Sequence, residues 1–570
     1  MTSAAPWIAH YDAGVPATLE PYPQRTVLDL FADGLRARPD AAVTWFKGAA
    51  LTHRQLDDAA NAFAAALAAL GVKRGDRVAL LLPNCPQFLI AEFGVWRAGA
   101  IVAPLNPLYS AEEIHGPLVL SGAETVVTLT PFYDRVRQAM AGTAVKRVIA
   151  TNIKEYLPPL LRVLFTLFKE KKEGHRVTLT AGDLRFHELL AAHAGAAAPA
   201  QPVAVGDVAT LLLTGGTTGE PKCAETTHGT YICAALQIRA WLGRFLTEWT
   251  APIMLPLPLF HVYGNVGVQA LAFATHNPIV LVPNPRDLTD VLKTIRRTHP
   301  AFFCGVPTLY NAIVNHPLTK TGSIDFHSMK ACVSGASPLM AETKERFETL
   351  TGGRIIEGYA LTESGLALVL NPLGGVNKIG SVGMPVPDVE LAIVDADSGD
   401  RAMPGGEVGE IIMRAPNLMR GYFRNPAETA AMLRSFGPGG KWLYTGDLGY
   451  LDGDGYLFIV DRKKDLIKPG GFQVWPREVE EAVSKHPAVQ DVGVVGAPDP
   501  ARGEIVVAYV VLRPGMTATE DDIKTFARQH LTGYKVPSRV EFRADLPKTM
   551  VGKVLRRKLR EPVAASGAAR

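Results

Sequence analysis

Five segments of the sequence carry residues whose types and spacing suit the binding and transfer of a phosphate-bearing substrate. The first, Leu211 to Lys222, reads LLLTGGTTGEPK, so an apolar strand would open into a glycine and threonine loop before a lysine. Glycines let backbone N–H groups converge on phosphate oxygens, threonine hydroxyls add donors, and the lysine adds positive charge. The spacing does not fit a Walker A loop. Taken alone, the segment indicates a phosphate site and a structural turn about equally.

The second and third segments carry groups that suit a nucleoside and a metal ion. Glu357 to Gly365 reads EGYALTESG, where the tyrosine offers a face for a purine, the threonine a hydroxyl for phosphate and the glutamate a carboxylate for Mg²⁺. The third joins YTGD, Tyr444 to Asp447, with Asp461 and Arg462. A carboxylate can accept both ribose hydroxyls, and an arginine can donate to the same sugar. The alternative for the second segment is a strand end with an exposed glutamate, and the alternative for YTGD is an ordinary turn.

The fourth and fifth segments lie toward the C-terminus. Lys464 to Val474 reads KDLIKPGGFQV, a charged stretch followed by a glycine turn. Hinges need positions that absorb large changes in φ and ψ, which an exposed charged connection permits. Pro547 to Leu559 reads PKTMVGKVLRRKL and is strongly basic. By themselves these segments predict a linker with a hairpin and a solvated basic face.

In this order, the five segments resemble the motifs of the adenylate-forming superfamily of acyl-CoA synthetases. The first resembles that family's phosphate loop, [ST]-[SG]-G-T-T-G-x-P-K-G, the second its Y-G-x-T-E core, and the fifth its P-K-x-x-x-G-K-[VI]-x-R-[RK] pattern. The chain departs from these patterns with Gly215 for a common serine, Cys223 for a glycine, and Ala360 for a glycine. The resemblance runs from Trp7 to about Leu559. The sequence holds no GxSxG or HExxH motif that would indicate another class.

The resemblance implies a site for ATP, Mg²⁺ and coenzyme A. It implies catalytic roles for Lys553, Thr362, Glu363, Lys464 and His261. It implies nucleotide or CoA contacts for Thr214, Gly215, Gly216, Thr217, Thr218, Gly219, Lys222, Gly335, Ala336, Ser337, Glu357, Gly358, Tyr359, Asp447, Arg462, Lys468, Gly470 and Gly471. Glu363 and Thr217 would hold the metal ion. Lys464 would be a pivot whose rotation withdraws Lys553 after adenylation and brings Gly471 to the pantetheine tunnel.

Two further segments indicate the acid. Leu255 to Asn265, LPLPLFHVYGN, resembles the family segment beside the acyl pocket, which implies that His261 lies near the substrate carboxylate or at the entrance. Asn265 stands where some long-chain members carry a tryptophan gate. Lys154 to Leu161, KEYLPPLL, resembles an insertion of bacterial long-chain fatty-acid ligases. We therefore expect a long-chain acid, although medium-chain, dicarboxylic and aryl acids would use the same five motifs.

An alternation of apolar strands and helices must position these residues. Leu51 to Gly71 reads as a helix, in which Thr52 and Gln55 form a capping-box pattern, an apolar stripe follows and a glycine ends the run. A strand, a helix and another strand follow within Arg77 to Pro104, an order typical of parallel sheets flanked by helices.

After Asp447 the pattern changes to short strands and turns, and a compact unit follows. We predict its helices at 476–486 and 520–531 and its strands at 489–495, 504–512 and 539–542. The fold is therefore expected to be α/β, with a large N-terminal adenylate-forming domain of helix-flanked sheets, residues 1–461, and a small mobile α+β C-terminal lid domain, residues 462–570. The charged run at 461–465 is typical of an exposed connection, with the hinge near Lys464.

Composition limits the partners and the setting of the protein. Its 570 residues are 47% hydrophobic and 20% charged, a globular balance, and a net charge of +4 over this length argues against a nucleic-acid partner. Five scattered cysteines without a CxxC motif favour reduced thiols over a zinc site. We expect a cytoplasmic protein, because no signal peptide or membrane-spanning run is seen. A homodimer is left open.

One apolar stretch leaves a peripheral membrane contact open. Leu157 to Phe168 reads LPPLLRVLFTLF and is followed by Lys169, Lys171 and Lys172. A helix packed on the core with a solvated basic end is the simpler interpretation. A helix lying on a membrane surface is the alternative.

The sequence therefore predicts an ATP- and Mg²⁺-dependent fatty acid:CoA ligase that forms an acyl-AMP and gives acyl-CoA, AMP and pyrophosphate. A CoA ligase for medium-chain, dicarboxylic or aryl acids, and an acyl-AMP ligase that loads a carrier protein, stay open as alternatives. Thioester formation with a carrier protein but not with free CoA would distinguish the latter. A non-catalytic nucleotide-binding module ranks last, because Lys553 and Glu363 are both present.

Overall fold

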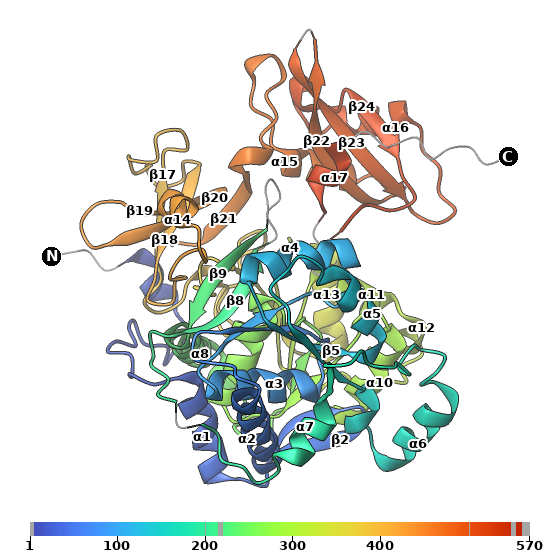
Figure 1. Cartoon of the computed structure of the whole chain (residues 1–570). Coiled ribbons are helices and arrows are strands. Elements are labelled where there is room, and N and C mark those ends of the chain that lie inside the picture. The colour runs from blue at the N-terminus through green and yellow to red at the C-terminus, as the bar shows by residue number, and fades with distance from the viewer. Residues whose placement is uncertain (1–4, 200, 215–220, 501, 549–553, 561–570) are drawn as a thin grey trace.

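The computed structural model describes residues 5–199, 201–214, 221–500, 502–548 and 554–560. Figure 1 shows a large body of helices around sheets, with the C-terminal strands and helices, in red, above it. Helices and strands alternate along most of the chain. The predicted fold class, a large N-terminal part of helix-flanked sheets with a small C-terminal part, is confirmed.

One large sheet is built around β3 (Arg77–Leu81), β4 (Ile101–Pro104) and β5 (Thr125–Leu129), which pair in parallel. Helix α3 (Pro86–Arg97) crosses from β3 to β4, and α4 (Ala111–Ser121) crosses from β4 to β5. Across the described residues the strand order is β7 (Leu184–Arg185), β6 (Arg147–Thr151), β5, β3, β4, β8 (Val208–Thr214), β9 (Lys222–Thr227). Parallel strands need such crossovers, so the predicted strand, helix and strand are confirmed.

A second large sheet carries two of the predicted motifs at neighbouring strand ends. Within the described part of the chain its order is β16 (Met384–Pro385), β15 (Val369–Leu370), β14 (Arg354–Tyr359), β13 (Ala331–Ser334), β12 (Phe302–Gly305), β10 (Ile253–Leu255), β11 (Ile279–Leu281), β1 (Ala42–Phe46), β2 (Ala49–Thr52). Strands β13 and β14 are parallel, with Ser334 opposite Glu357. The carboxyl ends of parallel strands meet at one edge of a sheet, so the loops after β13 and β14 are held together.

Helix α2 (His53–Ala69) forms as its local sequence predicts. The Thr52 hydroxyl accepts from the Gln55 N–H at 3.2 Å, and the Gln55 side chain accepts from the Thr52 N–H at 3.0 Å, the predicted capping box. The apolar stripe of α2 packs against α3. The other helices of this part are α1 (Val27–Ala37), α5 (Tyr133–Ala139), α6 (Pro159–Phe168), α7 (Phe186–Ala192), α8 (His228–Leu242), the π-helix η5 (Tyr263–Gln269), α9 (Ala270–Ala274), α10 (Leu288–Thr298), α11 (Pro307–Asn315), α12 (Pro317–Lys320) and α13 (Ala341–Thr351).

A third sheet leads to the C-terminal part. It contains β17 (Glu390–Val394), β18 (Gly409–Arg414), β20 (Lys441–Leu451) and β19 (Leu433–Ser435) in that order, with β21 (Leu457–Arg462) paired to β20 and helix α14 (Pro426–Met432) nearby. The buried residues of the main core end at Leu457, and those of the C-terminal core begin at Ile467. The domain boundary at 461 stays a prediction, and it falls between these two cores.

The C-terminal part has the predicted α+β composition. It contains α15 (Pro476–Ser484), β22 (Val489–Asp499), β23 (Gly503–Leu512), α16 (Glu520–Arg528), β24 (Arg539–Phe542) and α17 (Arg556–Arg560). Strand β22 continues beyond its predicted end at 495, because it pairs with β23 as far as Asp499 opposite Gly503. Strand β24 adds to β23 in parallel, and α15 packs against β22.

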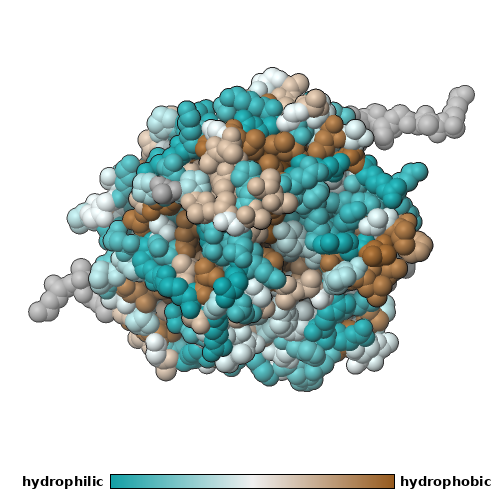
Figure 2. All heavy atoms as spheres, turned by 60° about the horizontal axis from the view of Figure 1, so that its bottom comes forward, coloured by the Kyte–Doolittle hydropathy of each residue, from teal (hydrophilic) through white to brown (hydrophobic). Residues whose placement is uncertain are grey.

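Helix α6 differs from the expected core-packed helix. Its buried residue is Phe165. Six of its apolar side chains are 41–71% exposed: Leu160, Leu161, Val163, Leu164, Leu167 and Phe168. Figure 2 shows a brown apolar patch at the right edge of the molecule, on the side where α6 lies in Figure 1. Among the described residues no helix is long and apolar enough to cross a bilayer. Leu157, just before α6, packs against the main core as expected. Within α6 the interpretation as a core-packed helix is wrong except at Phe165.

Candidate functional site

The predicted phosphate loop joins two strands of one hairpin. Thr214 is the last residue of β8 and Lys222 the first of β9, and the two are paired across the hairpin. The remaining predicted residues of the loop, Gly215, Gly216, Thr217, Thr218 and Gly219, lie outside the described residues and stay predictions. Cys223, the departure after the lysine, is buried against Ala103 and Leu211, and burial raises the pKa of its thiol to about 12. It is therefore a packing residue.

Tyr422 connects the lysine of this hairpin with the predicted metal ligand. The Lys222 ammonium lies 5.2 Å from the centre of the Tyr422 ring and forms an ion pair with Glu428 of α14. The Tyr422 hydroxyl donates to Glu363 Oε1 at 2.9 Å. Burial and the Glu363 charge raise the pKa of Tyr422, so its hydroxyl stays protonated. Sequence reasoning missed Tyr422, since it lies about sixty residues after the motif that it supports.

Thr362 and Glu363 lie in the turn that follows β14. The Met419 N–H donates to the Glu363 carbonyl at 3.0 Å, and the Gly365 N–H donates to the Thr362 carbonyl at 3.1 Å. Gly365 has a φ of +55°, and a Cβ there would lie 1.8 Å from the Asn417 carbonyl oxygen. A glycine is therefore required for the turn to pack on residues 417–419, and this packing holds both candidate side chains at the end of the strand.

The predicted ribose pair is brought together with the predicted aromatic residue. Asp447 lies opposite Arg462 in the β20–β21 register, and Arg462 Nε is 2.9 Å from Asp447 Oδ1. The Tyr359 hydroxyl donates to Asp447 Oδ2 at 2.8 Å. Burial and the Asp447 charge raise the pKa of Tyr359, and the same carboxylate raises the pKa of Arg462. Three residues from separate motifs thus form one hydrogen-bonded group.

A cavity of about 1000 Å³ opens beside this group. Its lining includes Ser334, Ala336, Ser337, Glu357, Gly358, Tyr359, Asp447, Asp461, Arg462, Arg477 and Arg556. Ala336 has a φ of +71°, a left-handed conformation that a residue with a Cβ adopts only when its surroundings impose it. Glu357 accepts from the Leu339 N–H at 3.1 Å, which fixes the loop after β13 against β14, and burial raises the pKa of Glu357. Gly335 lies in the same loop and packs against the Tyr263 ring.

The predicted hinge and glycine turn lie elsewhere. The Lys464 side chain reaches solvent, but the surrounding protein removes part of the water around its ammonium, and this desolvation with the nearby Arg462 charge lowers its pKa. Gly470 and Gly471 form a turn with φ values of +58° and +86°, and the Gly470 N–H donates to the Arg502 carbonyl at 2.8 Å. The Lys468 N–H donates to Glu504 at 2.7 Å. Lys464, Lys468, Gly470 and Gly471 are not among the described residues that line the cavity of about 1000 Å³.

Arg556 joins carboxylates on both sides of Lys464. Its guanidinium lies 3.0 Å from Asp461, 3.2 Å from Asp465 and 2.7 Å from Glu480 of α15. Burial opposes the charged form, but the carboxylates prevail and raise the pKa of Arg556. The sequence motif pointed instead to Lys553, which lies outside the described residues and stays a prediction.

His261 lies between β10, an inner strand of the second large sheet, and the π-helix η5. Burial lowers its pKa to about 4, so the imidazole is neutral near physiological pH. Its Nδ1 accepts from the Tyr263 N–H at 3.3 Å. A neutral imidazole in this place can accept or donate a hydrogen bond to a substrate without adding charge.

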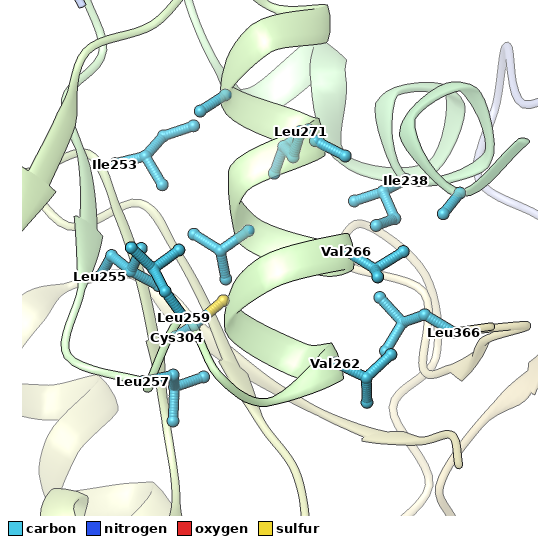
Figure 3. Packing of buried hydrophobic residues seen from close by; sticks show 14 of the residues in the cluster. Ile238, Ile253, Leu255, Leu257, Leu259, Val262, Val266, Leu271, Cys304 and Leu366 are labelled. Atoms are coloured by element: carbon cyan, nitrogen blue, oxygen red, sulfur yellow. The ribbon is translucent and has the colours of Figure 1, made fainter. Parts of the chain in front are cut away.

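An apolar cavity of about 30 Å³ lies beyond η5 and has room for about one water molecule. Its lining is Ile238, Leu242, Tyr263, Gly267, Val268, Leu271, Phe302, Cys304, Val333, Leu366, Leu368 and Leu370. Figure 3 shows Val262 and Val266 projecting from this helix on the side where Ile238 and Leu366 lie. A Cβ at Gly267 would lie 2.7 Å from Leu366. The glycine thus lets the segment of residues 366–370, which ends in β15, approach η5.

Asn265 belongs to a buried polar cluster and does not line this cavity. Its Nδ2 donates to Glu92 Oε1 at 2.7 Å, and Gln269 Nε2 donates to Glu92 Oε2 at 2.6 Å. The Tyr231 hydroxyl donates to Asn265 Oδ1. Burial raises the pKa of Glu92 to about 8. One face of η5 therefore bonds to Glu92 of α3 through the amide side chains of Asn265 and Gln269, and the opposite face lines the apolar cavity.

Comparison with known families accounts for most of the chain. The family described as "AMP-binding enzyme" matches residues 31–423, and the "AMP-binding enzyme C-terminal domain" matches residues 478–553.

Individual relatives match over nearly the full length. The chain is 38% identical over 562 residues to "Long-chain-fatty-acid--CoA ligase" of Bacillus subtilis, covering 98% of each protein. It is 36% identical over 559 residues to the protein of the same name from Salmonella typhimurium, covering 97% of this chain and 98% of the relative. Among solved structures, ATP-bound MatB from Rhodopseudomonas palustris has a TM-score of 0.79 at 27% identity, covering 94% of this chain and 98% of MatB.

Proposed function

The chain belongs to the AMP-binding enzyme family, and from this premise we propose that it activates a fatty acid with ATP and transfers the acyl group to CoA. The products are acyl-CoA, AMP and pyrophosphate, which makes the protein an AMP-forming acid–thiol ligase. The observation that carries the proposal is the hydrogen-bonded group of Tyr359, Asp447 and Arg462 on the wall of the large cavity. A long-chain acid is favoured by the similarity to proteins named for such acids.

The nucleoside is proposed to bind at this group. Asp447 would accept from the ribose hydroxyls, and Arg462, which already holds that carboxylate in place, would donate to the same sugar. The ring of Tyr359 would stack on adenine, with the loop of Gly335, Ala336 and Ser337 along the base. Because Asp447 is buried and fixed by two donors, little reorganisation is needed when ATP arrives.

In the first step a carboxylate oxygen of the acid attacks the α-phosphorus, an O–P bond forms, and the bond to pyrophosphate breaks. Negative charge gathers on the α-phosphate, and the Thr362 hydroxyl, Lys222 and the predicted donors Thr217 and Lys553 are suited to stabilise it. Glu363 fits a magnesium site, since its carboxylate is partly exposed and oriented by Tyr422. Glu363 and Thr217 would hold Mg²⁺, which when bound neutralises charge on the phosphate oxygens.

In the second step the CoA thiol releases its proton to solvent, its sulfur attacks the acyl carbonyl to form a C–S bond, and the C–O bond to AMP breaks so that AMP leaves with the electron pair. We propose that the domain of residues 462–570 turns about Lys464 between the two steps, so that Gly470 and Gly471 come to the CoA channel. The support is that Lys464 is exposed and lies between two separate cores. His261, neutral and near the apolar cavity, would orient the substrate carboxylate.

The apolar cavity favours an uncharged acyl tail. Among the described residues that line it, no side chain is charged, which disfavours a dicarboxylic acid. Its volume of about 30 Å³ is far below that of an acyl chain, so Leu366 and its neighbours must move when the tail enters. Peripheral membrane contact is also part of the proposal, and five free, buried cysteines fit a reducing compartment such as the cytoplasm. A homodimer stays a prediction.

The test is pyrophosphate release by the purified protein with ATP and Mg²⁺ over short, medium, long, dicarboxylic and aromatic acids, each with and without CoA. We expect release that requires a long-chain acid, with sustained turnover only when CoA is present. Release confined to another acid class would keep the mechanism and reject the substrate. No release with any acid would reject the proposal and favour a carrier-protein partner or a binding role.

A further inference from the structure

Helix α6 presents an apolar face to solvent. The exposed fractions are 70% for Leu160, 55% for Val163, 69% for Leu167 and 71% for Phe168, and Leu164 is 41% exposed. These residues recur at the spacing of one helix face, so they form a continuous surface, the α6 patch, which Figure 2 shows at the right edge. Apolar patches of this kind on a soluble protein mark interaction sites.

The opposite face fixes α6 to the body of the protein. Phe165 is buried, with its ring centre 5.1 Å from that of His175. Arg162 Nε donates to the Lys154 carbonyl at 3.1 Å. After the helix, Glu170 accepts from Asn152 at 3.0 Å and pairs with Lys154 at 2.5 Å. The patch is therefore held outward by specific contacts and is not a frayed end.

Positive charge adjoins the patch. Lys169, Lys171 and Lys172 follow α6 directly and are exposed, and residues 151–176 contain six basic and three acidic side chains. Of the acidic ones, Glu170 is buried and turned toward Lys154, so it contributes little outward negative charge. The exposed Glu173 pairs with Lys169 at 3.2 Å, so the outward positive charge beside the patch comes mainly from Lys171 and Lys172. An apolar helical face bordered by lysines is the pattern of a helix that lies in a membrane interface, where the lysines meet anionic headgroups.

We propose that the α6 patch and the lysines after it dock this protein on an anionic lipid bilayer. The charge complementarity favours this occupant over a second copy of the chain, because two copies meeting through this face would bring their lysine clusters together. A helix of ten residues is too short to span a bilayer, so α6 would lie along its surface. Docking places the enzyme where apolar acids partition. The inference rests on the membrane contact named in the proposed function and deepens it, by assigning that contact to one surface and to anionic lipid.

The test is co-sedimentation of the full chain with vesicles, without ATP, acid or CoA, so that its outcome is independent of the proposed activity. The vesicles are phosphatidylcholine alone, or phosphatidylcholine with roughly one-third phosphatidylglycerol. We expect the wild type to bind the anionic vesicles, and to bind them less as salt increases. Leu167→Ser with Phe168→Ser should lower the partition coefficient about tenfold or more, because two exposed apolar side chains are lost.

Two further variants keep the test specific. Lys171→Glu with Lys172→Glu should abolish the preference for anionic vesicles and its salt dependence. Val376→Ser with Ile379→Ser is the matched control, since these apolar residues are 65% and 75% exposed on another part of the surface and should leave binding unchanged. Equal loss in this control, or no vesicle binding by the wild type, would overturn the proposal. Concentration-dependent dimerisation that Leu167→Ser with Phe168→Ser removes, without vesicle binding, would assign the face to a second copy instead.

Discussion

Asp461 accepts hydrogen bonds across the proposed hinge, as the Ile459 carbonyl does from Arg477, and Asp461→Asn should shift the balance between domain arrangements. Its carboxylate accepts from Arg556 Nη1 at 3.0 Å and from the Arg477 N–H at 2.7 Å, both from residues after Lys464. The other two partners of Arg556, Asp465 and Glu480, also lie after Lys464. Rotation about Lys464 must break the contacts to Asp461 and can leave the others intact.

The size of the shift expected for Asp461→Asn follows from the burial of the Asp461–Arg556 ion pair. The Asp461 side chain is 2% exposed and that of Arg556 17%, so solvent screens the pair only weakly. A hydrogen bond to a charged group contributes about 1.5–3 kcal/mol, and asparagine keeps the shape but removes the charge and one acceptor. We take about 2 kcal/mol, which corresponds to roughly a thirtyfold shift away from the arrangement described here.

The assay compares two half-reactions, acid-dependent pyrophosphate exchange and thioester formation from preformed acyl-AMP. Asp461→Asn should change the ratio of their rates by roughly tenfold or more, and should speed trypsin cleavage at 462–468. Asp465→Asn is the matched control: its carboxylate is also buried and bound to Arg556 at 3.2 Å, but on the same side of the hinge. Equal changes in the two variants would refute the reasoning.

Four further outcomes are expected. Asp447→Asn should raise the KM for ATP about tenfold or more, measured by pyrophosphate release, because the ribose acceptor loses its charge. Lys553→Ala should slow adenylation by roughly 10² or more, and exchange at the wild-type rate would contradict its role. Lys464→Pro should impair the two half-reactions unequally, because proline restricts φ at the hinge; equal loss would count against the hinge. Burial raises the pKa of Glu92 to about 8, so the folded state keeps a proton that the unfolded state has already lost, and the free energy of unfolding falls as pH rises toward 8. The fall is at most roughly 1.4 kcal/mol per pH unit. In denaturation experiments Glu92→Gln should lack this pH dependence.

The sequence predicted those parts of the site that depend on local signals. Thr52 and Gln55 predict a helix start because a capping box needs only four consecutive residues, and the structure contains both the box and the helix. The association of Asp447 with Arg462 could be predicted because each belongs to a short motif, even though the β20–β21 register that places them opposite each other is not visible in the sequence. Their binding of a ribose stays a proposal. The order of the five segments along the chain carried the resemblance to the family, from which the other candidate residues were expected.

The missed residues act across long sequence separations. Tyr422 orients Glu363 from a loop with no motif of its own, and nothing in its neighbourhood distinguishes it from an ordinary surface tyrosine. Asn265 could be read only as a change at an expected gate, whereas its partner Glu92 lies on α3 more than 170 residues earlier. Side-chain pairs of this kind are set by the packing of whole elements, which periodicity does not encode.

The contacts of Lys222 change what its expected role as a phosphate contact requires. Its ammonium is already neutralised by Glu428, and it lies over the ring of Tyr422, whose hydroxyl holds Glu363. If a triphosphate binds at Lys222 as proposed, it must replace Glu428 as the partner of the ammonium, so separating the existing ion pair offsets part of the attraction. The same exchange would free Glu428 on α14, a helix that contacts β20, the strand that carries Asp447. We therefore expect occupancy of the proposed phosphate site to affect the proposed ribose site through the contact between α14 and β20, which the spacing of the motifs alone could not reveal.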